Sequence, residues 1–241
     1  MNDPARLYQA IDTTWPAAGY GESGPFTLRR GAGGGQRVSA ASLRHGDFTD
    51  ADIDAAEAAM QAMGQPLLFM IRAGDDVLDA ALAARGYFVK DPVVLFTAPV
   101  ADLARFDPQG LVAIDAPEPL AAMAEIWAEG GIGAGRLDVM RRAPDPRACF
   151  LGRIDDQPAG AAFVGTDGPV AMLHALEIRP AMRRRGLAVQ MIGAGAAWAQ
   201  RHGADTFALV VTQANDAACA LYRKLGMREA GRYHYRKKEP S

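Results

Sequence analysis

The stretch LHALEIRPAMRRRGLA, residues 173–188, decides how the second half of this 241-residue chain folds. Its apolar start predicts a strand, and a basic turn then leads into a helix rich in glycine and alanine. The first N–H groups of a helix lack intrahelical partners, and the helix dipole makes that end positive. Arg183, Arg184 and Arg185 add charge there, and Gly186 lets a ligand approach the backbone closely. The stretch therefore predicts an anion site suited to a pyrophosphate.

Two sequence blocks carry a resemblance to a known family. Arg183-x-x-Gly186-x-Ala188 is similar to the Arg/Gln-x-x-Gly-x-Gly/Ala signature with which GNAT superfamily enzymes bind the pyrophosphate of acyl-CoA. Asn215 and the segment ALYRKLGM, residues 220–227, resemble the family's Asn followed by Ala-x-x-Leu-Tyr-x-x-x-Gly-Phe, with methionine in the last place. The resemblance covers residues 111–238. It implies the GNAT acyl-CoA N-acyltransferase fold, an α+β fold with a mixed sheet, or a tandem repeat of that fold.

The first half carries no such pyrophosphate motif, and we interpret it as a degenerate GNAT-like repeat or a lid domain. Residues 77–97 and 218–236 share the order helix, glycine, strand, which indicates either an internal duplication or merely a common structural unit. A segment mixing proline, charge and small residues predicts a linker at 99–110. We therefore expect a GNAT-like domain over 1–98 and a catalytic domain over 111–241.

Hydrophobic periodicity and turn residues predict the elements of the second half. A glycine cluster at 130–135 is expected to end the first helix, and the glycine-rich segment 31–35 of the first half is expected to be a hairpin tip. The expected strands are 111–114, 149–154, 159–164, 170–178, 207–211 and further strands within 227–238, and the expected helices are 119–127, 189–202 and one from residue 215 or 216 to 225.

The resemblance implies direct attack of an amine on the thioester of acetyl-CoA, with no metal. It places the oxyanion donor on the backbone near residues 176–178, where the pantetheine also pairs, and gives Tyr222 the task of protonating the leaving thiolate. Without the resemblance, Tyr222 would be interpreted as a core tyrosine, and Asn215 is equally well explained as a helix N-cap. The expected cofactor-binding residues are Leu176, Glu177, Ile178, Arg183, Arg184, Arg185, Gly186, Leu187, Ala188, Val189, Asn215 and Tyr222.

Two residues are candidates for the general base. His174 resembles a histidine on the equivalent strand of arylalkylamine N-acetyltransferases that relays protons through water, and an ordinary histidine pKa near ~6.5 suits that task. A buried structural histidine is an equal alternative. Glu177 is the second candidate; strand alternation predicts that it faces away from His174 and pairs with Arg179 or another surface cation.

Composition narrows the class of protein. Hydrophobic residues make up 49% and charged residues 22%, and the formal net charge is -2, so neither a nucleic-acid partner nor a membrane partner is expected. Two cysteines without metal-ligand spacing predict a reduced, cytoplasmic setting. We expect a monomer or homodimer that acetylates a small-molecule or amino-acid-like amine. The alternatives are a protein or peptide N-acetyltransferase and a non-catalytic acyl-CoA sensor.

Overall fold

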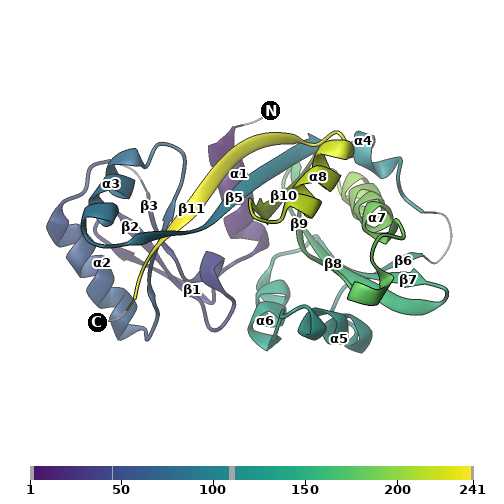
Figure 1. Ribbon diagram of the computed structural model, residues 1–241, viewed down its shortest axis with the longest axis horizontal. Helices are drawn as coiled ribbons and strands as arrows, with labels where there is room; N and C mark the ends of the chain where they lie inside the picture. Colours follow the sequence, from purple (N-terminus) through teal and green to yellow (C-terminus); the bar gives the residue numbers. More distant parts are fainter. Residues whose placement is uncertain (1–2, 45, 109–111, 240–241) are drawn as a thin grey trace. The chain divides into compact units, whose positions relative to one another are not determined.

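The computed structural model describes residues 3–44, 46–108 and 112–239, and the chain divides into two compact units (Figure 1). We call them the larger and the smaller unit. The larger unit comprises the described residues of Met1–Pro16, Leu95–Val210 and Asp216–Ala230. The smaller unit comprises those of Ala17–Val94, Val211–Asn215 and Gly231–Ser241.

The larger unit is built on a mixed sheet. Its strands are β5 (Phe88–Pro99) from Leu95 on, β6 (Ala113–Ala116), β7 (Arg147–Ile154), β8 (Gln157–Asp167), β9 (Val170–Ile178) and β10 (Thr206–Thr212) as far as Val210. They follow the order β5-β10-β9-β8-β7-β6. From β6 to β9 neighbouring strands are antiparallel, whereas β9 and β10 are parallel. That parallel pair requires a crossover between its two strands.

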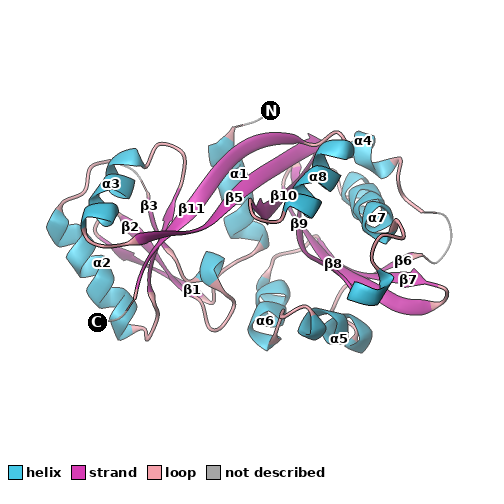
Figure 2. Ribbon diagram, in the orientation of Figure 1, coloured by secondary structure: helices cyan, strands magenta, loops and turns pink. Residues whose placement is uncertain are grey.

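Helices cover both faces of this sheet. They are α1 (Pro4–Thr14), α4 (Val100–Ala104), α5 (Ala121–Glu129), α6 (Ala134–Arg142), α7 (Leu187–Arg201) and α8 (Asp216–Lys224), with a 3₁₀ turn at Pro180–Met182. Helix α7 is the crossover from β9 to β10, and Figure 2 shows it on the opposite side of β7 and β8 from α5. Helix α1 lies on the other face from α7, since a Cβ added to Gly165 of β8 would lie 3.1 Å from the Cβ of Thr14.

The smaller unit has its own core. Its strands are β1 (Gly19–Ser23), β2 (Phe26–Arg30), β3 (Ala41–Leu43), β4 (Leu67–Ile71) and, from Gly231 on, β11 (Arg228–Lys238), in the order β1-β2-β3-β4-β11. The helices are α2 (Asp50–Ala62) and α3 (Asp76–Ala84), with a 3₁₀ turn at Gln36–Val38. Phe26, Phe69, Ile53 and Leu82 are fully buried between the sheet and these helices. The glycine-rich segment 31–35 connects β2 to β3.

The two halves of the chain repeat one topology. In each, three antiparallel strands are followed by a helical crossover to a parallel strand, then by a helix and a last strand: β1-β2-β3-α2-β4-α3-β5 and β7-β8-β9-α7-β10-α8-β11. The last strands are exchanged. Strand β11 of the second half pairs with β4 of the first half, and β5 of the first half neighbours β10 of the second. The fold is thus a tandem GNAT-like arrangement, as the sequence predicted.

Several boundaries differ from the sequence prediction. Helix α7 begins at Leu187 rather than at residue 189, and α6 occupies a region in which only glycine breaks were expected. The segment 227–238 forms one long strand, β11. The 149–154 and 159–164 strands form the expected hairpin, whose turn residues Asp155 and Asp156 have φ of 50° and 60°.

The expected linker is ordered in its described part and includes α4. Residues 109–111, where the linker was expected to end and the second domain to begin, lie outside the described residues. The compact units are not consecutive in sequence, because α1 groups with the larger unit. The two predicted domains, 1–98 and 111–241, therefore do not coincide with the two compact units. They stay a prediction about how the two halves of the chain arose.

We expect Gly193→Ala to destabilise the protein. Helix propensity alone favours alanine by about 1 kcal/mol. However, the new Cβ would lie 2.2 Å from the carbonyl carbon of Phe106, so α7 and the segment after α4 would have to separate. Overpacking of this kind costs about 1–3 kcal/mol, and thermal denaturation should show a lower Tm. Gly21→Ala, whose Cβ meets nothing within 4 Å, is the control; equal Tm values for both variants would contradict this packing.

Candidate functional site

Strand β9 contains a β-bulge at its centre. Its pairing with β8 joins His174 to Phe163 and Glu177 to Ala161, so two residues of β9 face one residue of β8 between these pairs. Ala175, the first residue of the bulge, has φ of 50°, an uncommon conformation for a residue with a Cβ. Strand β10 pairs with residues 170–173 of β9, and β9 continues to residue 178. Residues 176–178, where pantetheine was expected to pair, therefore lie past the residues that pair with β10.

A tryptophan from α5 holds the bulge in place. The indole Nε1 of Trp127 donates a hydrogen bond of 2.8 Å to the carbonyl oxygen of Ala175. Trp127 is completely buried, so this bond satisfies a carbonyl that the strand ladder leaves aside. Sequence reasoning placed Trp127 on the apolar face of a helix and missed this role.

The bulge corrects the predicted direction of Glu177. Simple alternation placed Glu177 and His174 on opposite faces of the strand, which is wrong, because the extra residue shifts the alternation by one. The partners of the two residues, Ala161 and Phe163, are two positions apart on β8 and so share a face. Consistently, a Cβ added to Gly130 at the end of α5 would lie 2.7 Å from the carboxyl carbon of Glu177. His174 and Glu177 therefore lie on the same face, away from α7.

Glu177 is paired with a residue of the basic turn. Its Oε1 accepts a hydrogen bond of 2.9 Å from Nη2 of Arg183, and Nε of Arg183 donates to the carbonyl oxygen of Ile178, also at 2.9 Å. Arg179 instead binds Glu129 of α5 at 2.8 Å. Of the expected partners of Glu177, the structure shows Arg183 and not Arg179. The contacts of Arg183 connect the basic turn to the end of β9.

The turn ends in a left-handed glycine at the start of α7. Gly186 is the residue before Leu187 and has φ of 85°, and a Cβ placed on it would meet nothing within 4 Å. Arg184 is exposed and has φ of 63°, while Nη2 of Arg185 binds Asp155 at 2.7 Å. The buried side chain of Leu187 anchors the helix start. Backbone N–H groups at the first turn of α7, including that of the half-buried Ala188, thus lie beside open space and positive charge. The N–H of Val189, also expected to bind the cofactor, instead donates to the carbonyl oxygen of Gly186 at 3.0 Å.

Tyr222 lies on the buried face of α8. It is 8% exposed, and its ring centroid is 5.7 Å from that of Phe96 on β5. Burial, with a smaller contribution from Cys219, raises the pKa of Tyr222 to about 12. The phenol therefore keeps its proton throughout the physiological range and is available as a hydrogen-bond donor.

The remaining predicted residues lie in different surroundings. His174 is 4% exposed, its Nε2 is 2.8 Å from Oγ1 of Thr14 on α1, and its ring centroid is 4.9 Å from that of Trp15, with the ring planes tilted by 35°. Asn215 directly precedes α8, the position of an N-cap, and belongs to the segment that groups with the smaller unit. The contacts of Glu177, Ile178 and the basic turn thus form one cluster, whereas those of His174 lie with α1.

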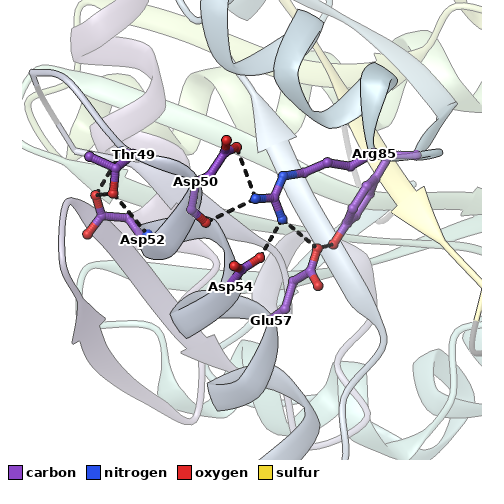
Figure 3. A network of polar contacts seen from close by, with 7 residues as sticks. Thr49, Asp50, Asp52, Asp54, Glu57 and Arg85 are labelled. Carbon is purple, nitrogen blue, oxygen red and sulfur yellow. Dashed lines mark hydrogen bonds and ion pairs between the residues drawn. The ribbon is translucent and has the colours of Figure 1, made fainter.

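The equivalent helix start in the smaller unit is closed and acidic (Figure 3). Helix α2 occupies the place of α7 between two parallel strands, but it begins with a capping box in which Thr49 and Asp52 satisfy each other's backbone N–H groups. The hydrogen bonds from Thr49 lower the pKa of Asp52. Asp50 and Asp54 flank it and pair with Arg85 at 3.0 and 2.6 Å. An anionic ligand would meet carboxylates here, in contrast to the start of α7.

Of these two helix starts, that of α7, on the larger unit, suits a bound anion. Comparison with known families agrees: residues 114–227 match the Acetyltransferase (GNAT) family. This part of the chain is therefore a GNAT acetyltransferase domain, and the resemblance seen in the sequence is confirmed.

Whole-chain relatives have the same fold. The chain is 25% identical to a Bacillus subtilis protein described as the uncharacterized N-acetyltransferase YobR, over 98% of this chain and 99% of that protein. A GCN5-related N-acetyltransferase from Kribbella flavida has a TM-score of 0.75 at 18% identity, covering 100% of this chain and 97% of the other. A tandem GNAT protein of the clavulanic acid pathway has a TM-score of 0.63 at 16% identity, covering 90% and 78%.

Within residues 3–44, 46–108 and 112–239, no group of three or more His, Cys, Asp or Glu side chains is arranged to hold a metal ion. In the same part of the chain, none of the helices combines the length and the apolar character that crossing a bilayer requires.

We expect Trp127→Phe to destabilise the larger unit. Phenylalanine fills most of the same space but leaves the carbonyl of the half-buried Ala175 without its donor, which costs about 1–3 kcal/mol. Denaturant unfolding followed by circular dichroism measures the loss. Trp198→Phe is the matched control, because Trp198 is also buried in this unit. A Trp127→Phe variant as stable as the wild type would show that the bulge does not depend on this bond.

Proposed function

We propose that this chain transfers an acetyl group from acetyl-CoA to the primary amine of a small-molecule or amino-acid-like acceptor. The observation that carries the proposal is the start of α7, where a left-handed, unobstructed Gly186 follows three arginines directly. A pyrophosphate suits such a helix start, because free N–H groups, the helix dipole and side-chain cations all favour negative charge. The neighbouring end of β9 offers backbone groups for the pantetheine.

Arginines of the turn have two different tasks in this proposal. Arg183 and Arg185 are held by Glu177 and Asp155, so they shape the turn and keep part of their charge neutralised. Arg184 is exposed and is the side chain that we assign to direct contact with phosphate oxygens. Leu187 and Ala188 contribute backbone N–H groups, and the backbone of residues 176–178 holds the pantetheine and the oxyanion.

In the reaction, the lone pair of the amine nitrogen forms a bond to the thioester carbonyl carbon while the carbon–sulfur bond breaks. The amine proton passes to a base, and the thiolate takes up a proton. Full transfer from Tyr222, whose pKa is about 12, to a thiolate whose conjugate acid has pKa about 8.5 would be uphill by roughly 5 kcal/mol. We therefore assign the Tyr222 hydroxyl to a hydrogen bond that stabilises the departing sulfur, with the final proton supplied from solvent.

The base is assigned to His174, with Glu177 as the second candidate. Both side chains lie on one face of β9, which makes a relay through water between them and the amine geometrically consistent. The carboxylate of Glu177 is already engaged in an ion pair with Arg183. This engagement is our reason for preferring the histidine.

The donor assignment predicts one acetyl-CoA per chain, bound at α7, because the equivalent helix start of the smaller unit is acidic and capped. Calorimetry should give a stoichiometry of one, and saturating acetyl-CoA should raise the Tm by mass action. Gly186→Asp should weaken binding about 100-fold or more, since a like charge about 4 Å away costs ~4 kcal/mol at an effective dielectric of 20.

Gly186→Asn is the matched control for Gly186→Asp. Both residues tolerate the left-handed conformation and have nearly the same size, so the two variants differ mainly by one charge. A carboxylate at a helix start interacts favourably with the helix dipole, so Gly186→Asp should be at least as stable to unfolding as Gly186→Asn. Equal acetyl-CoA affinities for the two variants would place the pyrophosphate elsewhere, and absence of binding by the wild type would refute the donor.

Removal of the Tyr222 hydroxyl should separate catalysis from binding. Tyr222→Phe keeps the ring that packs on Phe96, so we expect near-normal acetyl-CoA affinity but a kcat lower by about 10²-fold, the usual cost of losing one donor to a developing anion. The acceptor is first found in a turnover screen of polyamines, amino acids, aminoglycosides and peptides. Tyr87→Phe, which loses a buried hydroxyl bonded to Glu57, is the control. Wild-type kcat in Tyr222→Phe would remove Tyr222 from the mechanism.

A further inference from the structure

Helix α1, at the start of the chain, is packed on the strands that carry the candidate site. It lies with β8 and β9 in the larger unit, and its residues Leu7, Ile11 and Thr14 are buried. An ion pair between Arg6 and Asp167 of β8 fixes its orientation. A segment roughly 160 residues away in sequence therefore forms one wall around His174.

The last turn of α1 contacts the histidine ring directly. Oγ1 of Thr14 is 2.8 Å from Nε2 of His174, and both residues are almost completely buried. The ring of Trp15, the next residue, lies against the imidazole with centroids 4.9 Å apart, and that of Phe163 is 6.1 Å away. The ring is thus held by the Thr14 hydroxyl and by aromatic packing.

The hydrogen bonds of Thr14 determine which nitrogen carries the proton. A threonine hydroxyl has one hydrogen to donate, and that of Thr14 is donated to the carbonyl oxygen of Ala10 at 2.6 Å. Towards His174, Oγ1 can then only accept. Nε2 must therefore carry a hydrogen, both in the neutral ring and in the imidazolium, and the lone pair of the neutral ring lies on Nδ1.

We propose that Thr14 is a positioning residue that fixes His174 in the Nε2–H tautomer and so makes Nδ1 the nitrogen that exchanges the catalytic proton. This inference rests on the proposed function. When the amine attacks the thioester, its N–H proton passes through one water to Nδ1, and the imidazolium formed is stabilised by the Nε2–H bond to Thr14. The ring then returns the Nδ1 proton to solvent. Helix α1 thereby belongs to the catalytic machinery, although no motif of the sequence marks it.

The tautomer can be measured without any substrate. We would label the protein with ¹⁵N-histidine and record long-range ¹H–¹⁵N correlations at about pH 8.5, where a histidine of ordinary pKa about 6.5 is neutral. The chain has only four histidines, and His174→Gln identifies the resonances of His174. The expected result is a protonated Nε2 and an unprotonated Nδ1. A wild-type spectrum with the proton on Nδ1 would overturn the proposal outright.

Substitutions of Thr14 then test its part. Thr14→Val has nearly the same shape but no acceptor, so we expect the ¹⁵N resonances of His174 to move towards a mixture of tautomers and kcat to fall about 10-fold. Thr14→Ser keeps the hydroxyl and should preserve both the spectrum and kcat. Thr166→Val, which removes a buried hydroxyl bonded to Pro146, controls for a general loss of stability.

The outcomes distinguish this inference from the proposed function. An unchanged His174 spectrum in folded Thr14→Val would refute the positioning role. A shifted spectrum with unchanged kcat would show that Thr14 sets the tautomer but that Nδ1 takes no part in the reaction, which also overturns the proposal. The expected wild-type tautomer together with no acyl transfer to any amine would refute the proposed function and, with it, the catalytic task of Nδ1.

Discussion

The hydrogen bond from Trp127 to the carbonyl oxygen of Ala175 is the constraint on which the candidate site depends. The left-handed backbone of the half-buried Ala175 has a conformational cost, and a carbonyl without a hydrogen-bond donor would add another. The indole removes this second cost. Because the bulge persists, His174 and Glu177 share one face while Ile178 turns towards α7. Without it, β9 would continue its regular pleat, and the two candidate bases would lie on opposite sides of the sheet.

The two halves show how one topology can keep or lose an anion site. Both place a helix between parallel strands, and both helix starts would expose backbone N–H groups. In the second half, no atom lies within 4 Å of a Cβ placed on Gly186, so the start of α7 after the basic turn is accessible to a ligand. In the first half, Thr49 and Asp52 close it with their own side chains, and neighbouring carboxylates engage Arg85. The difference lies in a few side chains at one turn, not in the course of the backbone.

Sequence alone predicted the parts of the site that depend on local chemistry. The basic turn, Gly186 and the strand before them follow from hydrogen-bonding rules and from the family signature, and the GNAT fold is confirmed. The bulge was missed, although the odd separation of the buried apolar residues Leu173 and Ile178 was a signal that alternation fails between them. The contact of Thr14 with His174 could not be predicted, because it joins segments far apart in the chain through tertiary packing with no local periodicity.

The exchange of last strands has a consequence for the order in which the protein can form during synthesis. The sheet of the smaller unit consists mostly of residues 19–71, but its final position is taken by β11, so it stays incomplete until residue 238 has left the ribosome. The first half therefore presents an open edge beside β4 while the whole second half is translated. Domains usually fold one after another as they leave the ribosome. Here each half needs a strand from the other half to complete its set of strands. A gene split between the two repeats would yield two fragments that must find each other, rather than two independent proteins.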